Sequence, residues 1–309
     1  MKNLDFIIIG AQKSATTSLF KYLQPHPQIF MPSDKEAPFF SNQQMYEAGW
    51  DVFAAEYFAK AEADQLWGVA TPQYMGDPQA AGRIKEKMPA AKLIAVLRNP
   101  IDRAFSHFNM MRRRERETAD FDQVVDRLSD QAVIEQARNA MPQIAAGDYA
   151  EDETSHYLVW GEYGRILQHY LNFFPKDQLM IIYMDEMTAD PVKVYKDVLN
   201  FIGLSDDHIP DNVGKVYHKG GSKRIISHGL RSAISQNALF KLFWDLFPHN
   251  AKKSIRYWYD QKNVRKSSAE DGPSDSARAT LVDYFKDDIK LLEDIAGRDV
   301  PWSDFHSKD

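Results

Sequence analysis

The residues with the clearest capacity for chemistry follow the first apolar run of the chain. The stretch FIIIGAQKSATTSLF, residues 6–20, places a glycine, a lysine and several hydroxyls directly after that run. A strand that ends at Gly10 and turns into a helix gathers backbone N–H groups and the positive end of the helix dipole around one point. Lys13 adds a full charge there. The pattern indicates an anion site; the alternative is a turn capped by Thr16, with Lys13 in solvent.

The spacing of this loop differs from that of nucleotide triphosphatases, which require G-x-x-x-x-G-K-[ST]. Lys13 precedes the hydroxyls, and position 15 is alanine. A magnesium–nucleotide site also needs a carboxylate at a strand end, whereas KLIAVLR ends in Arg98 and LWGVAT in Thr71. We therefore expect an anion site without a metal, and the nine histidines form no convincing metal pair.

A second group of residues could bind another anion. In VLRNPIDRAFSHF, residues 96–108, Arg98 leaves a strand end and Ser106 lies about one turn beyond Asp102 in the next helix. Ligands of parallel sheets bind at the carboxyl ends of the strands. Two such sites at neighbouring strands would hold two phosphate groups of one ligand. The alternative is a surface arginine that pairs with Asp102.

The elements that must position these residues follow from apolar periodicity, which alternates between strand and helix. This alternation predicts an α/β fold with a central, mostly parallel sheet flanked by helices. The expected strands cover residues 4–10, 66–71, 92–98 and 178–186. The expected helices cover residues 16–24, 78–88, 101–116, 190–204 and 277–295, with Asp190 as an N-cap and Gly297 near the last helix end.

The chain, residues 1–309, is interpreted as one domain. It contains a helical insertion at about 121–174 and a loop-rich, aromatic substrate or lid region at about 205–270. The run RRRER, residues 112–116, is interpreted as a solvated helix face that could also attract an acidic acceptor.

Composition narrows the class of protein. A net charge of −6 argues against a dedicated nucleic-acid binder, and the absence of cysteine excludes disulfides, thiolate metal sites and cysteine nucleophiles. The apolar run before Gly10 is too short for a signal-peptide core or a membrane span, and no later run is long enough to span. We expect a soluble, cytoplasmic protein without a transmembrane segment, and composition predicts no oligomeric state.

Taken together, the motifs resemble those of the sulfotransferases that use 3′-phosphoadenosine 5′-phosphosulfate (PAPS), especially bacterial and heparan-sulfate members. KSATTSL, residues 13–19, resembles the 5′-phosphosulfate loop K-x-G-T-[TR]-x-L. LRNPIDRAFSHF, residues 97–108, resembles the 3′-phosphate motif R-[DN]-P-x-x-R-x-x-S, and KEAPFF, residues 35–40, resembles a segment that carries a catalytic acid. The resemblance continues through later segments, covers nearly the whole chain and implies a P-loop-like sulfotransferase fold.

The resemblance also implies roles for individual residues. Arg98 and Ser106 would hold the 3′-phosphate, and GGSKR, residues 220–224, resembles a loop that closes over the nucleotide. Tyr163 resembles a tyrosine that precedes a helix in many bacterial members, although a core aromatic is an equal alternative. The other implied donor-binding residues are Gly10, Lys13, Ser14, Ala15, Thr16, Thr17, Ser18, Gly221, Lys223 and Arg224.

Two positions depart from the family pattern. Ala15 replaces the usual loop glycine, and we expect the loop to keep its function if φ there stays below zero. Val69 and Ala70 stand where heparan-sulfate members tend to have Glu-Lys. The missing lysine weakens the case for a heparan-like polysaccharide as acceptor.

The predicted reaction is metal-free, in-line transfer of the sulfuryl group from PAPS to a hydroxyl or amine of an unidentified carbohydrate or small metabolite. Lys13 would stabilise charge on the bridging oxygen. The resemblance favours Glu36 as the general base; its alternative is a solvated carboxylate paired with Lys35, and His107 and His218 are the other candidate bases. A P-loop-like nucleotide kinase and a non-catalytic nucleotide-binding module are the competing functions.

Overall fold

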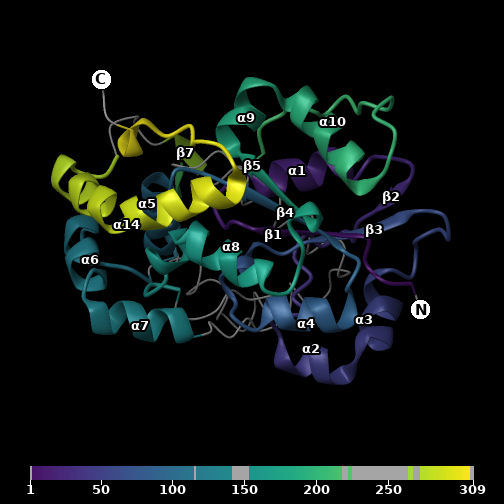
Figure 1. Ribbon diagram of the computed structural model, residues 1–309, viewed down its shortest axis with the longest axis horizontal. Coiled ribbons are helices and arrows are strands. Elements are labelled where there is room, and N and C mark those ends of the chain that lie inside the picture. Colours follow the sequence, from purple (N-terminus) through teal and green to yellow (C-terminus); the bar gives the residue numbers. More distant parts are fainter. Residues whose placement is uncertain are drawn as a thin grey trace, which may run out of the picture.

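Five parallel strands form the central sheet of the computed structural model, in the order β2-β3-β1-β4-β5 (Figure 1). The structure describes residues 2–114, 116–140, 153–217, 222–224, 264–266 and 272–306. The strands are β1 (Phe6–Gly10), β2 (Ile29–Phe30), β3 (Leu66–Ala70), β4 (Lys92–Leu97) and β5 (Leu179–Tyr183). The predicted α/β class is confirmed, and the edge strand β2 is an addition to the four predicted strands.

The strand order brings three loops to one edge of the sheet. β1 lies between β3 and β4, and all three strands point the same way. Just beyond the strand ends, the amide of Ala11 donates to the carbonyl of Val96 at 2.7 Å, and that of Thr71 donates to Ile8 at 3.1 Å. The segments after β1, β3 and β4 therefore begin side by side, at the edge where parallel sheets bind ligands.

Helices cover both faces of the sheet, because alternate residues of each buried strand point to opposite sides (Figure 1). Phe6 and Ile8 pack with α1 (Thr16–Leu23) and α10 (Pro191–Ile202). Ile7 and Ile9 face the opposite core, built from α4 (Ala80–Lys87), α5 (Pro100–Arg113), α8 (Tyr163–Leu171) and α14 (Asp275–Ala296). The remaining described α-helices are α2 (Gln43–Ala48), α3 (Trp50–Tyr57), α6 (Phe121–Leu128), α7 (Gln131–Asn139) and α9 (Met184–Ala189).

Helix boundaries follow the predicted capping residues in most places. Asp190 caps α10 by accepting from the amide of Lys193 at 2.9 Å, and α14 ends at Gly297 with φ of 69°. The strand predicted over 178–186 is too long. Its last residues begin α9, where the Glu186 carboxylate accepts from the amide of Tyr183 at 2.9 Å.

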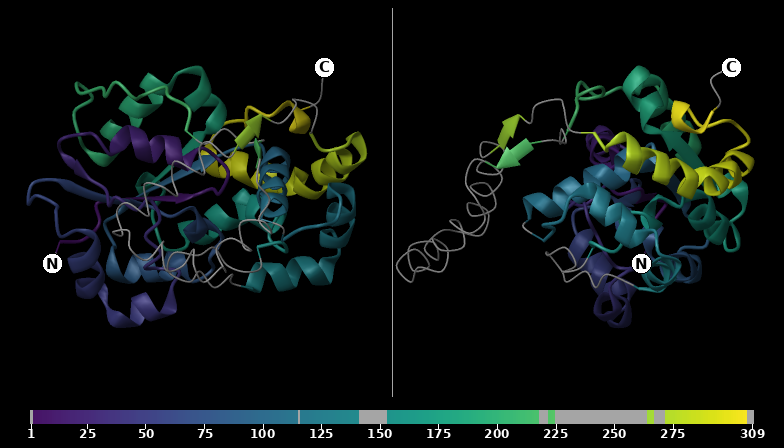
Figure 2. Two further views of the ribbon diagram at one scale, coloured as in Figure 1. Left: turned by 180° about the vertical axis from the view of Figure 1, so that it is seen from behind. Right: turned by 90° about the vertical axis from the view of Figure 1, so that its left-hand side faces the viewer.

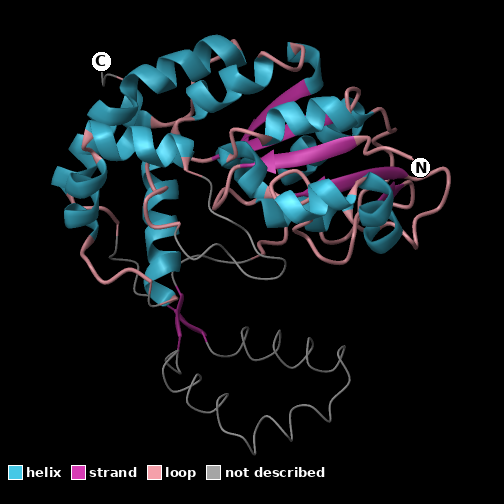
Figure 3. Cartoon of the chain, turned by 90° about the horizontal axis from the view of Figure 1, so that it is seen from below, coloured by secondary structure: helices cyan, strands magenta, loops and turns pink. Residues whose placement is uncertain are grey.

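Two further strands, β6 (Ser222–Arg224) and β7 (Val264–Lys266), pair antiparallel with each other (Figures 2 and 3). They form a separate two-stranded sheet that lies away from the main one (Figure 3). Lys223 and Arg224 are described here by their backbone alone, and His218 and Gly221 lie outside the described residues. Among the helices of the described ranges, none is long and apolar enough to cross a membrane.

Candidate active site

The loop after β1 leaves the first turn of α1 without a side-chain cap. Ala15 is the N-cap residue, with φ of 62°, and no described side chain makes the capping hydrogen bond. The predicted alternative, a turn capped by Thr16, is therefore wrong, and the condition stated for the function of the loop, φ below zero at Ala15, is not met. Because the first N–H groups of a helix have no partner within the helix, this end of α1 can receive an anion.

Lys13, also at positive φ (71°), extends from this loop towards α5. Its Nζ lies 3.9 Å from the Sδ of Met110. Residues four apart share a helix face, so Met110 adjoins Ser106 on one side and Arg114 on the other. The lysine predicted to serve one phosphate group thus reaches the helix predicted to serve the second.

Positive charge accumulates around Lys13. Burial, together with the guanidinium groups of Arg113, Arg114 and Arg98, lowers the pKa of Lys13 to about 8, and Glu153 acts in the opposite direction. Arg113 and Arg114 are half-buried, which differs from the solvated face predicted for this run. Among the described groups, three guanidinium groups and one carboxylate therefore act on Lys13, surroundings that suit an anionic ligand.

Tyr163 connects the two predicted anion-binding segments. Its hydroxyl donates to the main-chain carbonyl of Arg98 at 2.9 Å and also lies beside Ser14. The side chain is fully buried, and burial raises its pKa, so it remains a neutral donor. Asp102 pairs with Arg278 at 2.7 Å, which does not favour the alternative of an Arg98–Asp102 pair.

Two further residues of the α5 motif lie in the core. The Arg103 guanidinium is fully buried and donates to the carbonyl of Tyr157. His107 is fully buried, its Nε2 lies 2.9 Å from Oε2 of Glu153, and burial lowers its pKa to about 4. A weakly basic imidazole that is closed off from solvent does not favour the predicted role of His107 as a general base.

Glu36 lies in a loop that is anchored beside β1. The hydroxyl of Thr71 accepts from the amide of Ala37 at 3.0 Å and donates to its carbonyl at 3.1 Å. This clamp places the loop at the end of β3, the strand next to β1. The Glu36 carboxylate, 33% exposed, lies 3.5 Å from Nζ of Lys35, so the predicted pairing with Lys35 is also present.

The predicted donor residues 13–18, Arg98 and Ser106 all belong to segments at this edge of the sheet. Gly10 is glycine for a packing reason, because a Cβ there would lie 2.5 Å from the Cβ of Met75.

The sequence analysis missed Gln12 and Glu153, since neither belongs to a recognisable motif. In the described part of the chain, no three His, Asp or Glu side chains gather as a metal site would need.

The chain matches the family described as "Sulfotransferase domain" over residues 3–220. It is 39% identical over 105 residues to the membrane-associated sulfotransferase kil1 of Dictyostelium discoideum (34% of this chain, 22% of the relative). It is 29% identical over 206 residues to human bifunctional heparan sulfate N-deacetylase/N-sulfotransferase 3 (64% of this chain, 22% of the relative). Thus the chain matches only about a fifth of the length of these relatives.

The fold is also that of a solved bacterial protein. A sulfotransferase from Alicyclobacillus acidocaldarius superposes with a TM-score of 0.66 at 24% identity, covering 97% of this chain and 98% of that one. This likeness confirms the predicted architecture of a parallel sheet flanked by helices.

Proposed function

Because the chain belongs to the sulfotransferase domain family, we propose that it transfers the sulfuryl group of PAPS to a hydroxyl or amine of an acceptor. The observation that carries the proposal is the meeting of Lys13 with α5 beside Ser106, at the uncapped start of α1. Two anion-binding segments at one edge suit a ligand with separate 5′ and 3′ charges. Family membership supports neither the nucleotide-kinase alternative nor a module without catalytic activity.

The charge that develops during sulfuryl transfer indicates the role of each donor-binding residue. In the transfer, the acceptor oxygen or nitrogen bonds to sulfur while the bond from sulfur to the bridging oxygen breaks, which leaves 3′-phosphoadenosine 5′-phosphate (PAP). Negative charge grows on that bridging oxygen. A cation there stabilises the transition state more than the ground state, and Lys13 supplies it. Arg98 and Ser106 hold the 3′-phosphate, which aligns the donor for in-line transfer.

Glu36 is the proposed general base, and it would take the proton that the acceptor loses. Its anchored loop and partial exposure support this role, because the carboxylate is held at the edge and still open to a ligand. Nζ of Lys35 lies 3.5 Å from this carboxylate.

Calorimetric titration with PAP in the absence of magnesium tests the donor site. We expect PAP to bind and ATP and ADP, which lack the 3′-phosphate, to bind at least tenfold more weakly. Equal or tighter binding of ATP would remove the role given to Arg98 and reopen the kinase alternative.

Glu36→Gln tests the base separately from the donor site. The amide keeps the shape of the side chain but cannot accept a proton, so PAP affinity should stay unchanged while transfer slows by about 10²–10⁴-fold. Asp34→Asn, two residues away in the same loop and exposed, is the matched control. Full activity in the Glu36 variant would show that another group takes the proton.

The acceptor is proposed by class alone, as a carbohydrate or small metabolite. Kil1 is named as a membrane-associated protein and the human relative as a heparan sulfate enzyme. Val69 and Ala70 replace the Glu-Lys pair that heparan-sulfate members tend to have, so we favour an acceptor other than heparan. The cytoplasmic location and single-domain organisation stay predictions.

A further inference from the structure

A buried carboxylate lies behind the donor loop, outside every motif of the sequence. Oε2 of Glu153 accepts from Nε2 of Gln12 at 3.2 Å and lies 2.9 Å from Nε2 of His107. The side chains of Glu153 and His107 are 0% exposed. An ionised carboxylate is costly to bury without donors around it, so both hydrogen bonds matter for its position.

The protonation states of this group follow from its surroundings. Burial lowers the pKa of His107 to about 4, so the ring is neutral near pH 7. Although burial alone would raise the pKa of Glu153, the hydrogen bonds from His107 and Gln12 and the charge of Arg114 lower it. Neutral His107 therefore donates its Nε2–H to an ionised Glu153.

The two donors belong to the two anion-binding segments. Gln12 precedes Lys13 in the loop after β1, and His107 follows Ser106 in α5. Oε2 of Glu153 therefore links Gln12, which precedes the predicted donor-binding residue Lys13, to His107, which follows the predicted donor-binding residue Ser106. The charged groups that face Lys13 are Arg98, Arg113, Arg114 and Glu153; those that face His107 are Glu153, Arg103 and Lys13.

We propose that Glu153 is a positioning residue that fixes the loop after β1 against α5 and so sets the spacing between the two anion-binding segments. The naming of their ligand rests on the proposed function. Glu153 touches neither donor nor acceptor in this role; it acts through Gln12 and His107. As the one carboxylate facing Lys13 among the described groups, it also supports the charged form of that lysine.

Two substitutions separate geometry from charge. Glu153→Asp keeps the negative charge but shortens the side chain, so one oxygen can no longer reach both Gln12 and His107. Glu153→Gln keeps the length and an acceptor oxygen but removes the charge. Glu117→Gln is the matched control, because Glu117, which follows the end of α5, is also buried and pairs with Arg127 at 3.0 Å.

The experiment is calorimetric titration of PAP into the wild-type chain and the three variants between pH 6 and pH 9.5. We expect Glu153→Asp to weaken PAP binding by about tenfold at every pH, because the spacing is lost. Glu153→Gln should move the alkaline loss of affinity to lower pH by at least half a unit, because Lys13 loses its supporting anion. Glu117→Gln should match the wild type.

Gln12→Ala provides a second route if the Glu153 variants do not fold. It removes the loop side of the contact and leaves the Glu153–His107 pair in place, so PAP binding should weaken several-fold. Wild-type PAP affinity in Gln12→Ala, or wild-type affinity and pH dependence in both Glu153 variants, would overturn the positioning role. A wild-type chain that binds no PAP would instead overturn the proposed function, and the role of Glu153 in it.

Discussion

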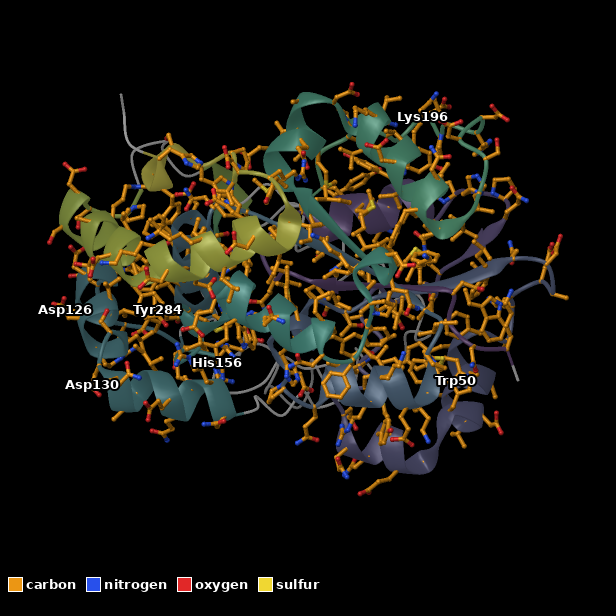
Figure 4. The ribbon with its side chains drawn as sticks, viewed as in Figure 1. Trp50, Asp126, Asp130, His156, Lys196 and Tyr284 are labelled. Atoms are coloured by element: carbon orange, nitrogen blue, oxygen red, sulfur yellow. The ribbon has the colours of Figure 1, made fainter. Side chains whose placement is uncertain are left out.

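Two buried charged groups of this chain, Glu162 and Lys13, have opposite kinds of described neighbours. At the start of α8, the Glu162 carboxylate accepts from Arg138 at 2.6 Å, from Arg165 at 2.5 Å and from the hydroxyl of Tyr284 at 2.6 Å. Tyr284, which belongs to α14, is labelled in Figure 4. At the end of β1, the described groups that act on Lys13 are the guanidinium groups of Arg98, Arg113 and Arg114 and the carboxylate of Glu153. The Glu162 cluster is matched within the protein, whereas among its described neighbours Lys13 is repelled by more groups than attract it.

The pKa shifts record this difference. Although burial opposes it, the hydrogen bonds from Arg138 and Tyr284 and the charge of Arg165 lower the pKa of Glu162, as in a satisfied ion pair. Burial and neighbouring cations lower the pKa of Lys13 to about 8, as for a cation without enough counter-charge. The matched cluster stabilises the fold, whereas the lowered pKa of Lys13 is what we would expect of a lysine that an anionic ligand stabilises on binding.

Lys13→Ala should produce the largest effect among the substitutions around Lys13. Loss of the cation at the bridging oxygen is expected to lower kcat by about 10²–10³-fold, with a smaller change in PAP affinity. Single-turnover transfer and PAP titration measure the two effects separately. Stability should not fall, because the substitution removes a desolvated and repelled charge. Wild-type kcat in this variant would show that Lys13 does not stabilise the charge on the bridging oxygen.

Arg98→Ala should act through nucleotide affinity. We expect PAP to bind about 10–100-fold more weakly, since a charge-assisted contact is lost. Adenosine 5′-phosphosulfate, which has no 3′-phosphate, should bind the variant and the wild type equally well. An equal loss for both nucleotides in competition titrations would show that Arg98 does not select the 3′-phosphate.

Arg138→Ala tests the matched cluster. Removing this partner of the buried Glu162 carboxylate should lower the free energy of unfolding by about 1–3 kcal/mol, measured in urea, and leave PAP affinity unchanged. Arg127→Ala is the control, because Arg127 is half-exposed in its pair with Glu117 and should contribute less than about 1 kcal/mol. A change in PAP binding without a change in stability would contradict the assignment of this cluster to folding.

The pH dependence of PAP binding tests directly whether the charged form of Lys13 is disfavoured in the free protein. The pKa of Lys13 in the free protein is lowered to about 8, and a bound anion raises it again. Binding above pH 8 must therefore take up a proton, so affinity should be flat below about pH 8 and fall by up to tenfold per unit above it. Lys13→Arg, which stays charged, should show a flat profile. A wild-type PAP affinity that stays constant up to pH 9.5 would contradict the explanation by titration of Lys13.

At the edge of the sheet where the strands end, the sequence predicted the strands and helices better than the buried side-chain contacts between them. Short apolar runs ending in Gly10 and Arg98 predict strands that lead into helices, and the motif spacing nominated the residues after them. The edge strand β2 has two residues, too few for a periodic pattern. Glu153 contacts Gln12 across 141 positions and His107 across 46, so no local pattern can indicate it.

Ala15→Gly should have the smallest effect, and it tests how the backbone conformation of the loop after β1 contributes to stability and PAP binding. Alanine at φ of 62° is strained by about 1–2 kcal/mol, whereas glycine adopts this conformation freely but costs about 0.4–1 kcal/mol more unfolded-state entropy. We expect a gain in stability of about 0–1.6 kcal/mol by urea unfolding, with PAP affinity within about twofold of wild type. Ala61→Gly, in a loop far from the site, should give no gain. A large loss of PAP affinity in Ala15→Gly would mean that the rigidity of alanine here, rather than the conformation alone, holds Lys13 over α5.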